Sequence, residues 1–172
     1  MSPENVQMKW HALYVMPRSE KKVGKYIAAL YPEVEVCIPT QKQYHQWSDR
    51  LKLVEVVLFS SYVFVGMRPQ LQQKIVEVPN VVRFVSFNKT PVVLSPRELA
   101  IIRQIGDAEY PVEITQHPFA PGDEVEITGG KLRGLRGRVV GLNGTAKILL
   151  AIPSLGCFAK VEVKRAEVQR TG

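Results

Sequence analysis

The sequence contains few of the residues that mark secreted, metal-binding or redox proteins. Its 172 residues include two cysteines and three histidines. Cys37 and Cys157 lie far apart and form no CxxC pair, so we expect them to be small buried residues rather than a disulfide or a metal site. The histidines are scattered without the spacing of metal ligands, which predicts no metal site and no cofactor.

Long apolar runs are also missing. No stretch approaches the roughly 18–20 apolar residues that a membrane-spanning helix needs. The first ten residues lack the apolar segment of a secretion signal. No nucleophile–base pair or carboxylate pair can be assembled from the sequence, and its glycine-rich segment lacks the G-K-[ST] ending of a phosphate loop. We therefore expect a cytoplasmic monomer without membrane contact that is not an enzyme.

Basic residues are abundant but unevenly distributed. The formal net charge is +7. Residues 1–105 carry 14 basic and 8 acidic side chains, and residues 121–172 carry 9 and 5. Residues 106–120 carry three acidic side chains and no lysine or arginine. Two basic regions joined by an acidic segment suit contact with nucleic acid, although charge alone predicts only non-specific attraction.

The first hundred residues alternate strand and helix patterns, which indicates an open sheet flanked by helices in the α+β class. The final helix of this region begins after Ser95, and Leu99, Ile102 and Ile105 form its expected core stripe. The other elements are predicted as strands at 9–16, 34–39, 61–67, 81–87 and 91–94, helices at about 19–30 and 69–76, and a hairpin at 41–57 with its tip at 47–50.

The C-terminal region reads as a small β-barrel. Residues 121–142 open with the turn signal Pro-Gly-Asp, continue as an alternating strand, and then interleave glycine with lysine and arginine. Short strands follow, and Asn143-Gly144 is a strong hairpin turn. Residues 107–120 break the periodicity with proline and are the predicted linker. The expected domains are therefore 8–106, 107–120 as linker, and 121–170.

Four segments in order resemble one protein family. These are W-x-x-L-Y-V-x-P-R-x-E-K-K-V at residues 10–23, L-F-S-S-Y-V-F-V at 58–65, V-V-R-F-V at 81–85, and the glycine-rich segment 121–142, which resembles a KOW motif. The chain resembles the NusG/RfaH family of transcription elongation factors from about residue 9 to 168. The resemblance implies an N-terminal NGN domain and a C-terminal KOW domain with the fold of an SH3-like barrel.

The resemblance also implies a function. NGN domains of this family bind the clamp helices of RNA polymerase, suppress pausing and termination, and favour elongation. The compact hairpin tip at residues 46–52 and the short linker make the chain most similar to the specialised UpxY-like and RfaH-like antiterminators, which act on particular operons. The alternatives are a housekeeping NusG that links polymerase to Rho or ribosomal protein S10, and a ribosome-associated or RNA-binding KOW protein.

Four aromatic residues, Tyr14, Phe59, Tyr62 and Phe64, match positions of the family's polymerase-binding patch. We expect Tyr14 and Phe59 to contribute to an exposed patch, with Tyr62 next, whereas Phe64 is expected in the core. Alternation along a strand cannot place all of these side chains on one side. In a generic strand each of them would more often be a core residue.

Two further sites are expected from the residues and the resemblance. The basic cluster is either a solvated helix face or a phosphate-facing patch for non-template DNA, and it consists of Arg18, Lys21, Lys22 and Lys25. Leu155 and Cys157 match the family's KOW partner-binding surface for ribosomal protein S10 or Rho. Cys157 replaces the arginine that the housekeeping factor commonly has there, which weakens the expectation of the usual partners.

Overall fold

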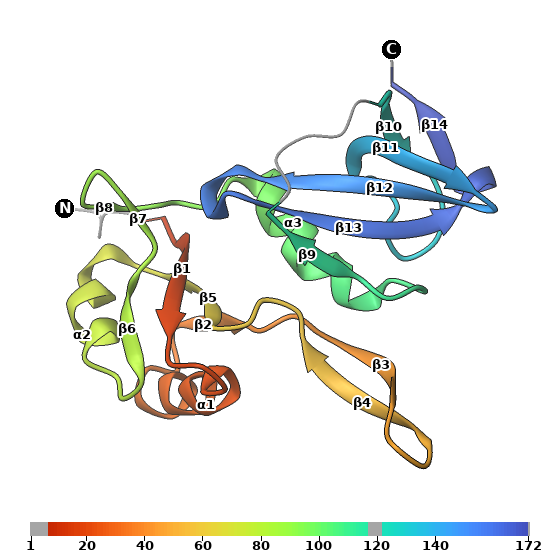
Figure 1. The fold of residues 1–172 in the computed structure, drawn as a ribbon. Coiled ribbons are helices and arrows are strands. Elements are labelled where there is room, and N and C mark those ends of the chain that lie inside the picture. The colour runs from red at the N-terminus through yellow and green to blue at the C-terminus, as the bar shows by residue number, and fades with distance from the viewer. Residues whose placement is uncertain (1–6, 117–121, 172) are drawn as a thin grey trace. The chain divides into compact units, whose positions relative to one another are not determined.

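Two compact units make up the part of the chain that is described, residues 7–116 and 122–171 of a computed structural model. The first unit contains the described residues up to Ile38 and Phe59–Ser95, and the second contains Pro39–Leu58 and the residues from Pro96 onward. Helices and antiparallel sheets occur together, so the predicted α+β class is confirmed (Figure 1). This division by packing differs from the predicted domains 8–106 and 121–170, which stay a prediction.

The first unit is built on a four-stranded antiparallel sheet. The strands are β1 (Lys9–Val15), β2 (Glu35–Cys37), β5 (Tyr62–Met67) and β6 (Val81–Phe84), in the order β2-β5-β1-β6. The central pair is in continuous register from Lys9 opposite Met67 to Tyr14 opposite Tyr62. Because side chains alternate along a strand, Leu13 and Val15 share one face of the sheet, and Ala12 and Tyr14 share the other.

Helices pack against the Leu13 face. They are α1 (Glu20–Leu30), the 3₁₀ turn η1 (Pro69–Leu71) and α2 (Gln72–Val76). Val23 and Ile27, four residues apart on α1, and Ile75 of α2 join the buried cluster formed with Leu13. Burial of each such side chain contributes roughly 1.5–3 kcal/mol. A separate two-stranded sheet, β7 (Ser86–Phe87) with β8 (Thr90–Pro91), follows β6.

The hairpin of the second unit begins one residue before the predicted range 41–57, and its end and its tip are as predicted. It consists of β3 (Thr40–Gln46) and β4 (Leu51–Val57), and residues 47–50 form its tip. At its base the buried Gln41 side chain donates to the carbonyls of Ala108 and Tyr110 at 3.1 and 2.9 Å, and accepts from the amide of Val112 at 2.9 Å. This amide side chain attaches the hairpin to residues 108–112.

The C-terminal sheet is the predicted small β-barrel. It has the order β14-β10-β11-β12-β13-β9. Its core comes from alternate residues, such as Ala146, Ile148, Leu150 and Ile152 of β12, which are all fully buried. Gly144, at φ +81, occupies the left-handed conformation that the turn between β11 and β12 requires. The strands are β9 (Glu113–Thr115), β10 (Glu124–Ile127), β11 (Arg136–Asn143), β12 (Thr145–Ile152), β13 (Cys157–Lys164) and β14 (Val168–Arg170).

Helix α3 (Pro96–Gln104) and the 3₁₀ turn η2 (Ile105–Asp107) precede β9. The predicted core stripe of Leu99, Ile102 and Ile105 is wrong at its first position. Leu99 is half-buried, whereas Glu98, Ile101, Ile102 and Ile105 are buried. The buried positions still have helical spacing. They begin at Glu98, whose carboxylate forms hydrogen bonds with a distant part of the chain.

Part of the predicted linker is a strand. β9 pairs with β13 in the register Phe158 opposite Thr115 and Lys160 opposite Glu113, and the Lys160 ammonium lies 2.6 Å from the Glu113 carboxylate. Residues 117–120 of that linker, and Pro121 of the predicted turn, lie outside the described residues. At least one acidic residue of the segment, Glu113, therefore forms an ion pair with a lysine of the barrel.

Candidate functional site

A row of three side chains crosses the first unit's sheet on the face opposite the main helices. Tyr14 of β1 lies between Tyr62 of β5 and Arg83 of β6 in the strand register. The two tyrosine rings meet edge to face, with centroids 5.7 Å apart, and the Arg83 guanidinium lies 5.4 Å from the Tyr14 centroid. Both tyrosines are half-buried and Arg83 is exposed. The row combines aromatic area with a positive charge, as protein-binding surfaces often do.

Phe59 does not belong to an exposed patch, which corrects the prediction for its side chain. Only 2% of Phe59 is exposed, and its ring lies edge to face against Phe64 with centroids 5.1 Å apart. Phe64 is fully buried, as predicted. Phe59 precedes β5 rather than lying within it, so strand alternation does not govern its direction.

A buried carboxylate holds the turn that leads to Tyr62. Glu20, at the start of α1, is 6% exposed and accepts a 2.7 Å hydrogen bond from the amide of Ser61. Ser61 adopts a left-handed conformation at φ +67, and its carbonyl accepts from the amide of Val15 at 2.9 Å. Two of the segments that carry the family resemblance therefore meet here. Sequence reasoning gave Glu20 no role, because its partner lies in a distant segment.

The predicted basic cluster is exposed on and before α1. Arg18 lies in the preceding loop with a left-handed backbone at φ +63, and Lys21, Lys22 and Lys25 follow on the helix. The Lys22 ammonium lies 5.8 Å from the centroid of the Tyr26 ring. Lys21 and Lys25 are four residues apart and so share a helix face. This arrangement fits a solvated face and a phosphate-facing patch equally well, and the role of the cluster stays a prediction.

Cys157 is buried, which corrects its expected place on a partner-binding surface. It begins β13 and is 8% exposed, on the same inward-facing side as Ala159, Val161 and Val163. Burial, and second the Glu98 carboxylate, raise the pKa of the Cys157 thiol from 9.0 to about 11. A protonated, inward-facing thiol is a packing group rather than a contact for a partner. Leu155, in the turn η3 (Pro153–Leu155), is half-buried.

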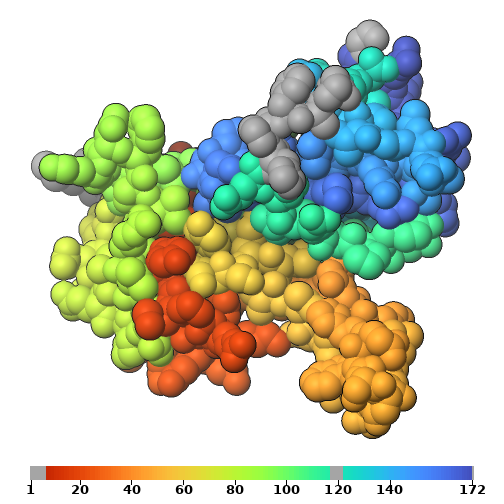
Figure 2. All heavy atoms as spheres, in the orientation of Figure 1, coloured from red at the N-terminus to blue at the C-terminus, as the bar shows by residue number. Residues whose placement is uncertain are grey.

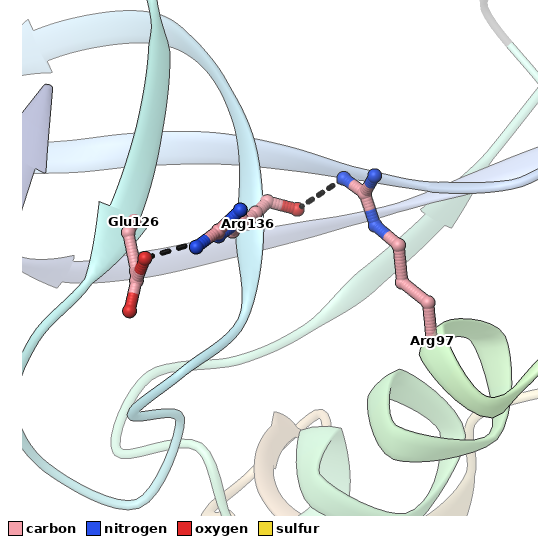
Figure 3. Close-up of polar contacts among 3 residues, drawn as sticks. All are labelled: Arg97, Glu126 and Arg136. Carbon is pink, nitrogen blue, oxygen red and sulfur yellow. Dashed lines mark hydrogen bonds and ion pairs between the residues drawn. The ribbon is translucent and has the colours of Figure 1, made fainter. Parts of the chain in front are cut away.

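Helix α3 makes polar contacts with the barrel. The buried Glu98 carboxylate accepts from the amide and the hydroxyl of Ser154, at 2.7 and 2.9 Å. Arg97 donates to the carbonyl of Arg136 at 3.2 Å, and the Arg136 guanidinium pairs with Glu126 at 3.0 Å (Figure 3). The helix that sequence reasoning assigned to the first domain thus contacts the η3 turn next to Leu155.

The arginines of the glycine-rich segment are largely engaged within the barrel. Arg136 and Arg138 stand opposite Glu126 and Glu124 in the β10–β11 register, and both pairs form ion pairs, the second at 3.7 Å. Exposed pairs of this kind contribute about 0–1 kcal/mol each. They favour the interpretation of these charges as exposed cross-strand pairs over an RNA-binding loop.

His11 is the one titratable ring buried among the described residues of the sheet. It is 2% exposed, and its Nδ1 donates to the carbonyl of Val92 at 2.8 Å. Within the described part of the chain its Nε2 has no hydrogen-bond partner. Burial lowers its pKa below 6.5, which the bond to Val92 partly opposes, while the charge of Lys9 lowers it further. The neutral ring is therefore a structural group.

Neither a metal-binding group nor a membrane-spanning helix is found in residues 7–116 and 122–171. No three His, Cys, Asp or Glu side chains of these residues are grouped to hold a metal ion. No helix in the same ranges combines the length and apolar character that crossing a membrane requires.

Comparison with known proteins gives a consistent result. Residues 8–103 match the family model described as transcription termination factor nusG. The transcription termination/antitermination protein NusG of Campylobacter jejuni is 24% identical over 94% of this chain and 97% of its own length. A solved structure, described as domain interaction in Thermotoga maritima NusG, has a TM-score of 0.62 at 24% identity and covers 96% of this chain and 98% of that one. The match to the solved structure shows the fold. The match to the family model covers more than half of the chain and therefore shows the family.

Proposed function

The chain belongs to the NusG family of transcription termination and antitermination factors, and from this premise we propose that it binds RNA polymerase through the Tyr62–Tyr14–Arg83 row. The observation that carries the proposal is the position of Tyr14 at the centre of that row, between an aromatic ring and a guanidinium. Half-buried aromatic side chains with an adjacent arginine are the residues most often found at the energetic centre of interfaces. Binding at the clamp helices would suppress pausing and termination without any chemical step.

Phe59 supports this surface rather than forming it. Its ring packs on Phe64, which stands opposite Ala12 in the strand register, two pairs away from Tyr14 and Tyr62 and on the same face of the sheet. A rigid aromatic pair beside the row lowers the entropy that the tyrosines lose on binding. Glu20 acts in the same way, since it fixes the Ser61 turn from which Tyr62 begins β5.

Arg18 and the lysines of α1 are proposed to contact the phosphates of non-template DNA beside the polymerase. Their exposure supports this role, since each is accessible to a phosphate group. Replacing Lys21 and Lys25 with Glu should weaken recruitment to elongation complexes at low salt, and the loss should shrink as salt rises. A loss of recruitment that does not depend on salt would contradict phosphate contact.

Leu155 is proposed as the contact for ribosomal protein S10 or Rho, without Cys157. A partner that binds Leu155 has to compete with the hydrogen bonds that Ser154, in the same turn, donates to the Glu98 carboxylate. Glu98→Ala should therefore strengthen binding of the partner and should speed alkylation of Cys157. If Glu98→Ala speeds alkylation of Cys157 but strengthens binding of neither S10 nor Rho, Leu155 is not the partner contact.

The test of polymerase binding compares, in the full chain, the half-buried Tyr14 of the row with an exposed aromatic residue outside the row. Tyr14→Ala should weaken binding to core polymerase by about 30-fold, the effect of losing roughly 2 kcal/mol at an interface. The control is Phe87→Ala on β7, which removes a ring that is 73% exposed and lies outside the row. Equal binding by both variants, with circular dichroism that shows both folded, would overturn the proposal.

A specialised role on particular operons is the finer part of the proposal. Its support is the replacement of the family's arginine by the buried Cys157, which removes one contact for the general partners. Recruitment should then depend on the sequence of the non-template strand, because phosphate contacts position a protein whereas base contacts specify. Equal recruitment to scrambled templates would favour the housekeeping factor, and ribosome co-sedimentation without polymerase binding would favour a ribosome-associated protein.

A further inference from the structure

The tip of the β3–β4 hairpin concentrates several large, exposed apolar side chains within ten residues. Every residue from 44 to 53 is exposed. Four of them are large and apolar, with exposed fractions of 68% for Tyr44, 55% for Trp47, 60% for Leu51 and 46% for Leu53. The tip is the orange group of atoms in Figure 2. A two-stranded hairpin is marginally stable alone, and concentrated apolar exposure marks a contact surface.

The strand register sorts the tip into two faces. Tyr44 stands opposite Leu53, and Gln46 stands opposite Leu51, so these residues share one face. His45 stands opposite Lys52 on the other face. Trp47 follows two residues after His45, and the Lys52 ammonium lies 5.8 Å from the centroid of its ring. We call the second set, His45, Trp47, Arg50 and Lys52, the cationic face.

The charges of the cationic face differ from those of the barrel. Arg136, Arg138 and Arg170 each pair with a carboxylate. Among the described residues Arg50 has no such partner, although Asp49 is its neighbour in the turn closed by the bond from the Trp47 amide to the Arg50 carbonyl. A guanidinium and an ammonium beside an exposed indole can contact an external anion without breaking an existing ion pair.

We propose that the hairpin tip binds single-stranded RNA, with a base stacked on Trp47 and the adjacent phosphates held by Lys52 and Arg50. A flat aromatic ring flanked by cations is the arrangement that unpaired nucleotides recognise, since every base has a face to stack and every linkage carries a negative charge. The complementary charge favours this occupant over an apolar protein segment, for which the face carrying Tyr44, Leu51 and Leu53 is the better match. The site lies outside the Tyr62–Tyr14–Arg83 row and does not depend on polymerase binding.

Asp49 is the turn residue through which the hairpin tip can distinguish RNA from DNA. Ser48 and Asp49 lie between Trp47 and Arg50, and both are exposed. A carboxylate repels phosphates, so it contributes to binding only where it accepts a hydrogen bond from the ligand. The 2′-hydroxyl of RNA supplies such a donor at every nucleotide, and DNA does not. Asp49 is therefore assigned to the 2′-hydroxyl.

The direct test uses the fluorescence of the full chain. The sequence has two tryptophans, and only Trp47 is on the hairpin, while Trp10 is half-buried in β1. Titration with an oligouridylate of about twelve nucleotides, within the range of known single-strand sites, should quench Trp47 emission through stacking. Trp47→Phe should abolish the quenching but retain part of the affinity, measured by anisotropy of a labelled oligonucleotide.

Variants of the two faces separate stacking from general effects. Trp47→Ala should weaken binding by about 5- to 100-fold, the range for loss of one stacked base. Tyr44→Ala removes an exposed ring from the opposite face and should change binding less than about twofold. Replacing Arg50 and Lys52 with Gln should reduce the slope of log affinity against log salt by about 1.4, since each phosphate contact on a single strand contributes about 0.7.

The matched deoxy oligonucleotide tests the choice of RNA. Oligodeoxyuridylate should bind more weakly than oligouridylate, and Asp49→Ala should reduce the ratio of the two affinities. Equal affinity of the native chain for the two would overturn the assignment to RNA. No quenching by either oligonucleotide, or equal losses in the Trp47→Ala and Tyr44→Ala variants, would overturn the site itself.

Discussion

Aromatic side chains meet antiparallel strands in two regions of the molecule, the β5–β1–β6 sheet and the β3–β4 hairpin. At the sheet, Phe59, which precedes β5, packs edge to face on Phe64 of β5, and both are at most 2% exposed. In the hairpin, Tyr44 and Trp47 are 68% and 55% exposed. The strands are of similar length, and both regions place a cation near an aromatic ring.

The difference lies in what covers each sheet. In the first unit the main helices bury one face, and the Tyr14–Tyr62 and Phe59–Phe64 ring pairs lie on the other. Along the hairpin the buried contact is at the base, where Gln41 bonds to residues 108–112. The Phe59–Phe64 pair therefore stabilises the fold, whereas Tyr44 and Trp47 of the hairpin remain available for binding. The following experiments test this contrast, from the largest expected effect to the smallest.

The largest contrast is expected between two aromatic truncations. Phe59→Ala should lower the free energy of unfolding by about 3–5 kcal/mol, because it leaves a cavity beside Phe64. Tyr44→Ala should change it by less than about 0.5 kcal/mol, because its ring is exposed. Urea titrations followed by circular dichroism measure both values. Similar losses of unfolding free energy in the two variants would contradict the comparison, because they would show that the Tyr44 ring is also packed.

A second contrast concerns the turns that lead into the two regions. The Ser61 amide is bonded to the buried Glu20 carboxylate, whereas the hairpin turn is closed by its own backbone bond from Trp47 to Arg50. Glu20→Ala leaves the Ser61 amide without this partner and should cost about 1–3 kcal/mol of stability. Glu33→Ala is the matched control, since it removes an exposed carboxylate. If Glu33→Ala lowers stability as much as Glu20→Ala does, the effect comes from the change in net charge and not from the lost hydrogen bond.

The sequence predicted the hairpin more accurately than the sheet surface. The polar turn at residues 47–50, between two β-forming segments, sets the hairpin bounds through local turn chemistry. Phe59 could not be placed in that way, because it lies in the turn before β5, where the two-residue period does not apply. Cys157 could have been placed, since Ala159, Val161 and Val163 continue its alternation along β13.

Contacts between distant segments were beyond sequence reasoning. Glu98 looks like an exposed residue in the first turn of a helix, yet its carboxylate bonds to Ser154 far along the chain. Glu20 and Ser61 are a similar pair. A single sequence holds the propensity of each residue but not the tertiary partner that makes burial of a charge favourable. The family resemblance predicted the fold, and these contacts required the structure.

The buried ring of His11 adds a pH dependence to the sheet. Because burial lowers its folded-state pKa below 6.5, the unfolded chain binds more protons than the folded chain between those two values. The contribution to stability is present above pH 6.5 and is lost as pH falls towards the folded-state pKa. His11→Asn, which keeps a donor for Val92, should flatten the stability profile in this window. Urea titrations between about pH 5 and 7 measure it. An unchanged profile would show that His11 titrates alike in both states.

The smallest expected effect compares the two cation–aromatic pairs. Double-mutant cycles on Tyr14 with Arg83 and on Trp47 with Lys52 measure the coupling free energy of each pair. Such pairs contribute roughly 0.5–1 kcal/mol at exposed sites. The sheet pair, at 5.4 Å, should approach this value, because the register holds Tyr14 and Arg83 opposite each other.

The hairpin pair, at 5.8 Å, should couple more weakly than the sheet pair, because Lys52 loses side-chain freedom on an exposed tip to hold its position. Weak coupling also keeps the Lys52 ammonium free to leave the indole for a phosphate. A coupling at Trp47–Lys52 equal to that at Tyr14–Arg83 would mean that the hairpin tip is as fixed as the sheet. The sheet and the hairpin would then differ only in how exposed their aromatic side chains are, and not in how firmly those side chains are held.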